Sequence, residues 1–427
     1  MKKFSFAYGE EEFICRLNPD NVLGILRSKH LPSPASEEAV VRKAVENPIG
    51  SLRLRDIARS GEKACIIIGD MTRLWARYHV MVPVILEELS QAGVPDKDIT
   101  IISATGAHRL QTAAEHEQLI GIEIYKRIKV VDHDCHADNL VDLGTTSRGT
   151  PVRINRRVYE ANRTILTSGI VHHFLAGYGG GKKAIMPGVS SFESIMANHK
   201  LALNPNGPGL NPDVRAGKLK GNPLAEDMVE AARMAGADFI VNSIVNDEHK
   251  VALAVAGDLT AAHEAGCVMV DEYFGVPITE LADLVIASCG GYPKDINLYQ
   301  TYKTAHNMVR AMKQGGVGIL ISESCEGIGN DRFRTICTDF CDNEEREHEL
   351  KNNYEIASFM GYTQLLWAQE NSIIAVTSLP DEQIRAMGMI PARTLDEALS
   401  VAGGLLTSNY KGYLMPLAAT TFPMFNK

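Results

Sequence analysis

The chain has 427 residues, of which 45% are hydrophobic and 22% are charged, and its formal net charge is −9. This length exceeds what one hydrophobic core usually supports, so two domains are expected. The acidic balance argues against a nucleic-acid-binding protein, because phosphate backbones require a basic face, although a local group of Arg and Lys can still hold one small carboxylate.

The cellular setting follows from the N-terminal segment and the cysteines. The segment MKKFSFAYGEEEF has two lysines but no continuous apolar stretch behind them, and no apolar run is long enough to cross a bilayer. The eight cysteines are scattered and include no CxxC pair, a usage typical of reduced thiols rather than a disulfide framework. We therefore expect a cytoplasmic protein without a membrane partner.

Short apolar runs alternate with helical stretches along the first half of the chain. Buried strands are predicted at 64–69, 99–104, 128–131 and 164–168, and a helix is predicted over 79–92. This alternation is typical of a mostly parallel sheet covered by helices on both faces.

A second series of apolar runs follows a helix that starts near Leu259. Its strands are predicted near Leu284, at 317–321 and at 373–377, and the boundary between the two series lies within 270–282. A second parallel sheet is therefore expected in the last third of the chain.

The predicted fold class is α/β, with two α/β domains of mostly parallel sheets and an active site in the cleft between them. The N-terminal domain is expected to cover residues 1–275 and to be rejoined by the tail 401–427. The C-terminal domain is expected to cover residues 276–400. No low-complexity linker separates the two.

Polar side chains follow three of the predicted strands of the first domain. Asp70, Thr72 and Arg73 come directly after the first strand, His108 follows the second and His173 follows the fourth. Ligands of open α/β sheets bind at the carboxyl ends of the strands, so these side chains outline a site. Two imidazoles that accept or return a proton near neutral pH suit a reaction on either face of a carbon atom.

A glycine-rich stretch, FLAGYGGGKKAIMPG, follows His173. Gly179, Gly180 and Gly181 allow a sharp turn and a close approach to a ligand, and exposed amides there would suit a phosphate. The stretch does not match the common nucleotide loop, because Lys183 stands where a Ser or Thr belongs. Two alternatives remain open: a flexible surface turn with two solvated lysines, and a non-catalytic phosphate- or nucleotide-binding protein that uses this loop alone.

Two further candidates lie outside these strand ends. His199 ends a predicted helical stretch, IMANHK, and could bind a metal. The segment NLYQTYK places Tyr299, Gln300 and Lys303 within one helical turn, so that Gln300 and Lys303 could hold a carboxylate from one face. An amphipathic helix with an exposed lysine is the alternative interpretation of this segment.

Taken together, the motifs resemble the lactate racemase family. The similarity runs in order from about residue 40 to residue 305 and is carried by NPIGS, DMTR, TGAH, H-x5-GGG-x-K-x3-PG, NH and YQxxK. The resemblance implies a nickel-pincer nucleotide, a pyridinium mononucleotide whose thioamide and thiocarboxylate groups hold nickel.

The resemblance also implies which residues hold this cofactor. Lys183 rather than Lys182 should form the covalent link, because the family lysine stands four residues before the PG pair. His199 should complete the coordination of nickel, for which imidazole is a suitable ligand. The remaining cofactor-binding residues are expected to be Asp70, Thr72, Gly179, Gly180 and Gly181. The enzymes that make the cofactor are implied as partners.

The implied activity is racemisation or epimerisation of a 2-hydroxy acid. A hydride moves to and from the cofactor through a 2-keto acid, and the two acid/base residues are His108 and His173. The small 2-hydroxy carboxylate substrate would be bound by Arg73, Tyr299, Gln300 and Lys303. A relative whose chemistry has drifted to hydroxy-acid redox or dehydration is the alternative on the same scaffold.

One departure from the family pattern concerns the substrate. The family often has a proline after the arginine of its DxTR motif, but Leu74 and Trp75 follow Arg73 here. This changes the wall beside the arginine that is expected to hold the substrate, so the motifs do not single out lactate among 2-hydroxy acids.

Overall fold

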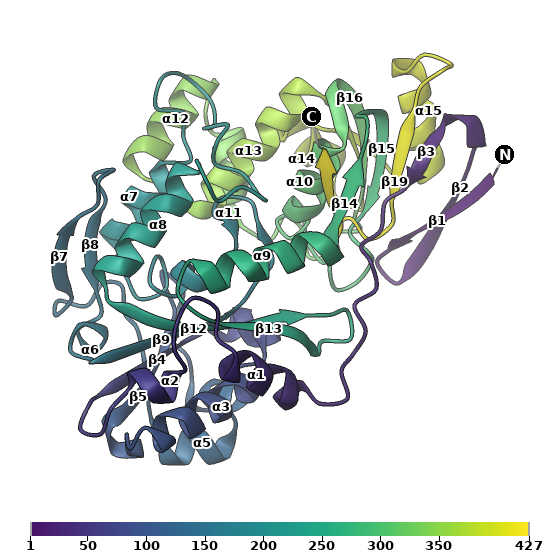
Figure 1. The fold of residues 1–427 in the computed structure, drawn as a ribbon. Helices are drawn as coiled ribbons and strands as arrows, with labels where there is room; N and C mark the ends of the chain where they lie inside the picture. Colours follow the sequence, from purple (N-terminus) through teal and green to yellow (C-terminus); the bar gives the residue numbers. More distant parts are fainter. Residues whose placement is uncertain (1, 426–427) are drawn as a thin grey trace. The chain divides into compact units, whose positions relative to one another are not determined.

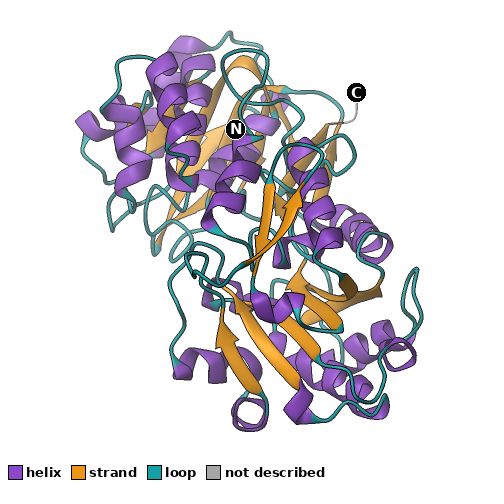
Figure 2. Cartoon of the chain, turned by 90° about the vertical axis from the view of Figure 1, so that its left-hand side faces the viewer, coloured by secondary structure: helices purple, strands orange, loops and turns teal. Residues whose placement is uncertain are grey.

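The computed structural model describes residues 2–425, and the chain forms two compact units (Figures 1 and 2). The larger unit contains residues 30–205 and 211–272, and the smaller unit contains the residues up to 29, 206–210 and those from 273 onward. Each unit is built on one six-stranded sheet. The predicted fold class, two α/β domains with mostly parallel sheets, is confirmed.

The sheet of the larger unit is parallel except at one edge, where β13 (Val251–Gly257) runs antiparallel to its neighbour β12 (Ala237–Val245). The strand order is β13 (Val251–Gly257), β12 (Ala237–Val245), β9 (Arg163–Gly169), β4 (Ala64–Gly69), β5 (Ile99–Ala104) and β6 (Lys129–Asp132). The helices are α1 (Glu37–Glu46), α2 (Leu54–Ile57), α3 (Tyr78–Gln91), α4 (Ala113–Ile120), α5 (Ile122–Arg127), α6 (Arg156–Tyr159), α7 (Phe192–Lys200), α8 (Pro223–Met234) and α9 (Ala261–Phe274). A separate two-stranded ladder joins β7 (Val141–Thr145) and β8 (Pro151–Ile154).

The main hydrophobic core of this unit lies between the sheet and the helices α1 and α3. Ile66 and Ile68 are alternate residues of β4, and both pack into this core. Met81, Ile85 and Leu89 recur every four residues on α3 and are fully buried against it. Burial of each such side chain contributes roughly 1.5–3 kcal/mol. The strands are therefore fixed in place up to the residues where their carboxyl ends leave the sheet.

The order of the strands reverses at β4. The chain moves from β4 to β5 and β6 on one side and then returns to β9 on the other side of β4. In open α/β sheets such a switch point leaves a crevice beyond the carboxyl ends of the two strands concerned. The segments that follow β4 and β9 are those in which polar residues were predicted to meet.

The sheet of the smaller unit is parallel throughout. Its order is β18 (Ile390–Ala392), β17 (Ser372–Val376), β16 (Met312–Ile321), β15 (Ala282–Ser288), β19 (Gly412–Met415) and β3 (Val22–Ile25). Its helices are α10 (Tyr302–Arg310), α11 (Asp331–Thr338), α12 (Asn343–Asn352), α13 (Ile356–Glu370), α14 (Asp381–Ala386) and α15 (Leu395–Leu405). Two further ladders join β1 (Lys2–Tyr8) to β2 (Glu11–Leu17) and β14 (Gly275–Ile278) to β20 (Phe422–Phe425).

The extents of the two units differ from the predicted domains at both ends of the chain. The tail was predicted to rejoin the first domain, but its described part, residues 401–425, belongs to the smaller unit, because β19 pairs with β15 and β3, and β20 pairs with β14. Residues up to 29 also belong to the smaller unit, where β3 forms an edge of the sheet. The chain passes into the smaller unit after residue 272, whereas the prediction divided it after residue 275.

Within residues 2–425, the structure contains no helix with the length and apolar character needed to span a membrane.

Candidate functional site

The end of β4 carries a carboxylate that its own loop holds in place. Asp70 is the N-cap residue of the 3-10 helix η2 (Met71–Ala76), and its Oδ1 accepts hydrogen bonds from the backbone N–H of Thr72, at 3.0 Å, and from the Thr72 hydroxyl. Burial by itself would raise the pKa of Asp70, but hydrogen bonds from His108 and Thr72, together with the charge of Arg73, hold this pKa below its usual value. The carboxylate is therefore ionised although it is buried.

His108 lies in the turn that follows β5. Its backbone N–H donates to the carbonyl oxygen of Thr105 at 2.9 Å, and its Nδ1 contacts Oδ2 of Asp70. Because an ionised carboxylate can only accept, Nδ1 carries the hydrogen, and the neutral ring has its lone pair on Nε2. About half of the His108 side chain is exposed, at 49%, so Nε2 could exchange a proton with a bound molecule.

The helix η2 also positions Arg73 and Trp75. Arg73 is exposed, and its Nη1 donates to the hydroxyl oxygen of Thr72 at 2.9 Å, so Thr72 links the guanidinium to Asp70. The indole of Trp75 lies against Gly169 at the end of β9, where a Cβ would collide with the ring. Trp75 is one of the two residues that depart from the family pattern. Its ring therefore fills the space at the end of β9, next to the switch point of the sheet.

Beyond β9 the chain forms a short hairpin that carries the second histidine. Strand β10 (His172–His173) pairs antiparallel with β11 (Gly177–Tyr178). The turn between them is closed on His173, whose Nδ1 accepts hydrogen bonds from the backbone N–H groups of Leu175 and Ala176, each at 3.2 Å. A nitrogen that accepts two hydrogen bonds carries no hydrogen, so the hydrogen of the neutral ring is on Nε2.

Lys183 contacts this histidine directly. Its Nζ lies 2.8 Å from Nε2 of His173. Since Nε2 holds the hydrogen of that ring, it donates to the amine, which must present a lone pair and is therefore neutral. Burial, followed by the charges of Arg73 and Lys182, lowers the pKa of Lys183 well below its usual value, in agreement with this assignment. A neutral, desolvated lysine amine is a nucleophile that can form a covalent link.

Lys182 has a different environment from Lys183. It is 1% exposed, and its Nζ is buried without a hydrogen-bond partner among residues 2–425. Burial lowers the pKa of Lys182 to about 8, against opposing influences from Cys267 and Glu264 of α9. Neither lysine is solvated as the flexible-turn alternative required.

The three glycines before these lysines fit a tightly confined loop. Gly180 and Gly181 have φ angles of 82° and 48°, and a Cβ at Gly181 would come within 2.9 Å of the His263 ring. The backbone N–H of Gly181 donates to Oδ1 of Asn242 at 3.0 Å, and that of Gly179 donates to the Val171 carbonyl oxygen at 2.8 Å. These two amides are already bonded within the protein, so the N–H groups of Gly179 and Gly181 are not the exposed donors that would suit a phosphate.

His199 lies near the end of α7, as its segment predicts. It is buried, and its Nδ1 donates to the Ile195 carbonyl oxygen at 2.8 Å, which leaves the lone pair of the neutral ring on Nε2. Burial, and then the charge of Lys183, lower the pKa of His199 to about 4, so the ring is neutral at pH 7. This is the form of imidazole that binds a metal. Residues 2–425 contain no group of three or more His, Cys, Asp or Glu side chains that could hold a metal ion.

The predicted residues of the larger unit are thus connected. Two direct contacts, Asp70 with His108 and His173 with Lys183, bring residues from three strand ends and the glycine loop into pairs. The charge of Arg73 lowers the pKa of Lys183, and the charge of Lys183 lowers the pKa of His199. The two pairs and His199 therefore lie in one region.

The other predicted residues belong to the smaller unit. Tyr299 and Gln300 precede α10, which begins at Tyr302, so the prediction that they share one helical turn with Lys303 is wrong. The turn has this form because its backbone bonds to another loop, with the N–H of Tyr299 donating to the Ile328 carbonyl oxygen at 2.9 Å. Lys303 is exposed in the first turn of α10.

Trp367 of α13 packs beside α10 in the same unit. Its ring stacks on that of Tyr302 at a centroid distance of 5.2 Å, and the His306 ring lies 5.8 Å away. The two aromatic contacts attach α13 to the helix that carries Lys303.

Sequence reasoning missed several residues that support the glycine loop. Asn242 of β12 bonds to Gly181, and His263 of α9 donates from Nε2 to the Gly179 carbonyl oxygen at 2.7 Å. His172 and Tyr178 both contact Asp271 of α9. No local motif marks these residues, because their partners are up to 99 positions away in the sequence.

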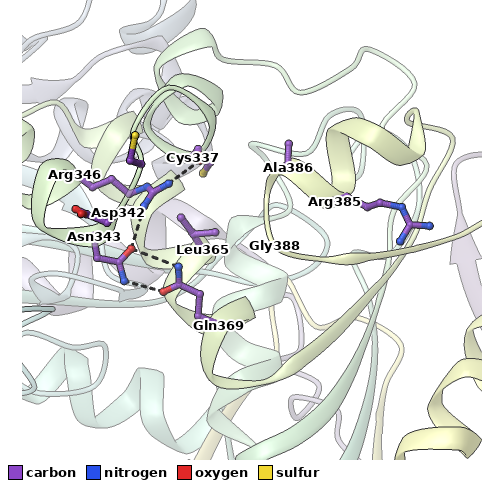
Figure 3. Close-up of a pocket in the computed structure, with 10 residues that line it drawn as sticks. Cys337, Asp342, Asn343, Arg346, Leu365, Gln369, Arg385, Ala386 and Gly388 are labelled. Atoms are coloured by element: carbon purple, nitrogen blue, oxygen red, sulfur yellow. Dashed lines mark hydrogen bonds between the residues drawn. The ribbon is translucent and has the colours of Figure 1, made fainter.

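A hollow of about 500 Å³ in the smaller unit does not contain any of the predicted site residues (Figure 3). Its wall includes Arg346, which donates to the carbonyl oxygens of Ile336, Cys337 and Phe340 and so caps the end of α11. Cys337 is buried in α11, whereas Cys341 follows the helix and is exposed. The guanidinium of the buried Arg346 is therefore bonded to backbone carbonyl oxygens of the protein itself.

Comparison with known proteins identifies the family. The model of the lactate racemase N-terminal domain matches residues 8–209, and that of the lactate racemase C-terminal domain matches residues 278–417. The chain belongs to the lactate racemase family. It is 32% identical over 429 residues to the lactate racemase of Thermoanaerobacterium thermosaccharolyticum, covering 97% of this chain and 98% of that protein. It is 33% identical over 414 residues to the lactate racemase of Lactiplantibacillus plantarum, covering 94% and 95% respectively.

Solved structures agree with this assignment. The lactate racemase apoprotein of T. thermosaccharolyticum matches with a TM-score of 0.88 and 32% identity, and the match covers 100% of both chains. A protein of Thermotoga maritima matches with a TM-score of 0.62 at 17% identity, covering 92% of this chain and 99% of that one, and this likeness concerns the fold alone. The chain is therefore a member of a family of isomerases, and the predicted resemblance is confirmed.

Proposed function

We propose that this protein racemises or epimerises a 2-hydroxy acid and carries a nickel-pincer nucleotide attached to Lys183. The observation that carries the proposal is the contact of 2.8 Å between the Lys183 amine and Nε2–H of His173, which requires a neutral and therefore nucleophilic lysine. Membership of the lactate racemase family and the two relatives that bear that name support the substrate class.

The residues of the larger unit fit such a cofactor. Lys183 offers a nucleophilic amine for the covalent link, and His199 offers a neutral ring with its lone pair on Nε2 for nickel. Cβ atoms at Gly180 and Gly181 would approach Asn242 and His263 to within 3.0 Å and 2.9 Å, so glycine keeps this turn compact beneath the lysine. When bound, the cofactor supplies the acceptor and donor of a hydride.

The acid/base role is assigned to His108 and His173. Nε2 of His108 takes the proton of the substrate hydroxyl while the α-hydrogen leaves with its electron pair, and a 2-keto acid results. Asp70 accepts the Nδ1–H of His108 and stabilises the imidazolium ion formed in this step. His173 is assigned the same role toward the opposite enantiomer or epimer, which requires its ring to give up the Nε2 hydrogen that it donates to Lys183 in the unmodified chain. Return of the hydrogen with its electron pair to the other face of the ketone, and of a proton to its oxygen, inverts the centre.

The substrate is held by its oxygens in this proposal. Arg73 carries an exposed guanidinium that suits a carboxylate, and Thr72 orients it through the hydrogen bond of 2.9 Å. Tyr299, Gln300 and Lys303 of the smaller unit are proposed as further substrate-binding residues. The enzymes that make the cofactor are the partners that this function requires.

The first test is intact mass spectrometry with nickel analysis on protein produced together with the enzymes that make the cofactor. We expect a nucleotide-sized adduct and nickel in the wild type and in Lys182→Met, but neither in Lys183→Ala. Lys182→Met is a matched control because it removes the neighbouring amine, which is buried and has no hydrogen-bond partner among residues 2–425.

The same preparations would then be assayed with a panel of 2-hydroxy acids for loss of optical purity. An adduct that is present in Lys183→Ala, or absent from the wild type under these conditions, would contradict the proposal. Racemisation that persists when His108 and His173 are both replaced would contradict the acid/base assignment.

A further inference from the structure

Asp271 of α9 contacts both strands of the hairpin that carries His173. Its Oδ1 accepts a hydrogen bond from Nε2 of His172 at 2.8 Å, and the hydroxyl of Tyr178 lies 2.7 Å from both of its carboxylate oxygens. His172 and Tyr178 are directly opposite each other in the β10–β11 ladder, and their rings are 5.3 Å apart. One carboxylate therefore holds both strands of the hairpin together.

The next pair in the same ladder is the one that bears on the chemistry. His173 is opposite Gly177, and the glycine loop with Lys183 follows directly. The orientation of the His173 ring depends on the hairpin because its Nδ1 accepts from the backbone of Leu175 and Ala176, which lie between the two strands. A change in the separation of β10 and β11 would therefore rotate His173 relative to Lys183.

Helix α9 contacts this segment along one face. His263, Cys267 and Asp271 are spaced by four residues, so they share a face, and His263 bonds to Gly179 at 2.7 Å. Gly266 allows the helix to approach Ile170 and Val255, since a Cβ there would collide with both side chains. The helix is thus fixed against the sheet at one end of the loop, and Asp271 reaches the hairpin from two turns further along.

We propose that Asp271 is a positioning residue, which acts through His172 and Tyr178 to keep His173 in register with Lys183. This inference rests on the proposed function, since His173 is the acid/base residue that it serves. Asp271 acts through its contacts to His172 and Tyr178, so its effect is on orientation rather than on proton transfer. The proposal assigns a role to His172, the sequence neighbour of His173.

The test compares Asp271→Ala and Tyr178→Phe with Glu272→Gln, the control at the adjacent, exposed glutamate. Racemase activity is measured per molecule of adduct-bearing protein, and the ring nitrogens of His173 are followed by NMR in protein labelled with ¹⁵N-histidine. For Asp271→Ala we expect kcat to fall about tenfold with little change in KM. A loss of this size is typical when a residue that orients a functional side chain through hydrogen bonds is removed. The ¹⁵N shifts of His173 should move from those of the Nε2–H tautomer toward a tautomer mixture, and Tyr178→Phe should do the same to a smaller extent.

Two outcomes would overturn the inference. One is an unchanged kcat and unchanged His173 shifts in both variants; the other is an equal loss in Glu272→Gln. If Asp271→Ala does not fold, Tyr178→Phe, which removes one hydroxyl, carries the test. A wild type without adduct or activity would refute the proposed function instead, and the His173 shifts would still test the positioning role of Asp271.

Discussion

Hydrogen bonds fix the protonated nitrogen of each histidine assigned a role in the larger unit. His108 bears its hydrogen on Nδ1 because that nitrogen faces Asp70, whereas His173 bears it on Nε2 because its Nδ1 accepts two backbone N–H groups. His199 resembles His108, with its Nδ1–H directed at a backbone carbonyl. In the unmodified chain His108 therefore presents an acceptor at Nε2, while His173 presents a donor to Lys183.

Asp70→Asn tests the partner of His108. An amide cannot fix the Nδ1–H tautomer or stabilise an imidazolium ion as a carboxylate does, so kcat should fall by about 10²-fold, the lower range for loss of acid/base catalysis. Steady-state assays on adduct-bearing protein would measure this. Asp138→Asn, at an exposed aspartate, is the control and should change kcat little. A kcat within twofold of the wild type in Asp70→Asn would contradict the role given to His108.

Single residues illustrate what sequence reasoning could and could not find. Lys183 was distinguished from Lys182 by its spacing to the PG pair, and the structure gives the two amines different surroundings. The importance of His263 and Asp271 was not predictable, because each acts on the glycine loop from a helix that lies about 80 to 100 positions away in the sequence. Motifs identify residues near one another in sequence, whereas these contacts depend on the packing of α9.

At the scale of elements, the glycine-rich hairpin depends on backbone conformations that other residues rarely adopt. Gly177 has a φ angle of 72°, and a Cβ there would run into the carbonyl oxygen of Lys218. Gly149, in the turn between β7 and β8, has a φ angle of 85° but no atom within 4 Å of such a Cβ. A comparison of substitutions at the two positions therefore separates the cost of backbone strain from the cost of steric collision.

Gly177→Ala should lower the free energy of unfolding by more than Gly149→Ala, whose cost is about 1 kcal/mol from the left-handed backbone alone. Because β11 would be displaced from β10, the Gly177 variant should also lose much of its cofactor adduct, while the Gly149 variant keeps it. Urea unfolding and intact mass would measure the two effects. Equal destabilisation by both substitutions would mean that the hairpin tolerates displacement.

Strands buried on both faces were the easiest elements to predict. The ranges predicted for β4 and β5 agree with the structure, because each is a mostly apolar run bounded by polar residues. The places of β3 and β19 were not predictable, since each enters the smaller unit's sheet through pairing with strands distant in the sequence. The hydrophobic pattern identifies a strand but not its neighbours.

At the scale of the whole molecule, buried neutral histidines make stability depend on pH. Burial, and then the charge of Lys182, lower the pKa of His263 to about 3, against an ordinary value of 6.5. As the pH falls below 6.5 the unfolded chain takes up a proton that the folded protein does not, so stability is lost down to about pH 3. Each pH unit in this range costs roughly 1.4 kcal/mol for one such group.

His263→Gln removes the ring that takes up this proton. The slope of the free energy of unfolding against pH should therefore fall between pH 6 and pH 4, by the equivalent of up to one bound proton, although the variant is less stable at pH 7. The measurement is urea unfolding at a series of pH values. His30→Gln, at an exposed histidine, is the control. A slope that is unchanged in His263→Gln would show that this ring is already protonated in the folded protein.

The placement of the two tryptophans gives each unit its own fluorophore. Trp75 lies against Gly169 in the larger unit, close in sequence to Arg73, and Trp367 stacks on Tyr302 in the smaller unit, beside the helix of Lys303. Replacing either indole leaves a protein whose tryptophan emission comes from one unit only. The chain thus carries two built-in optical labels, with which the response of each half to a ligand could be followed separately and without chemical modification.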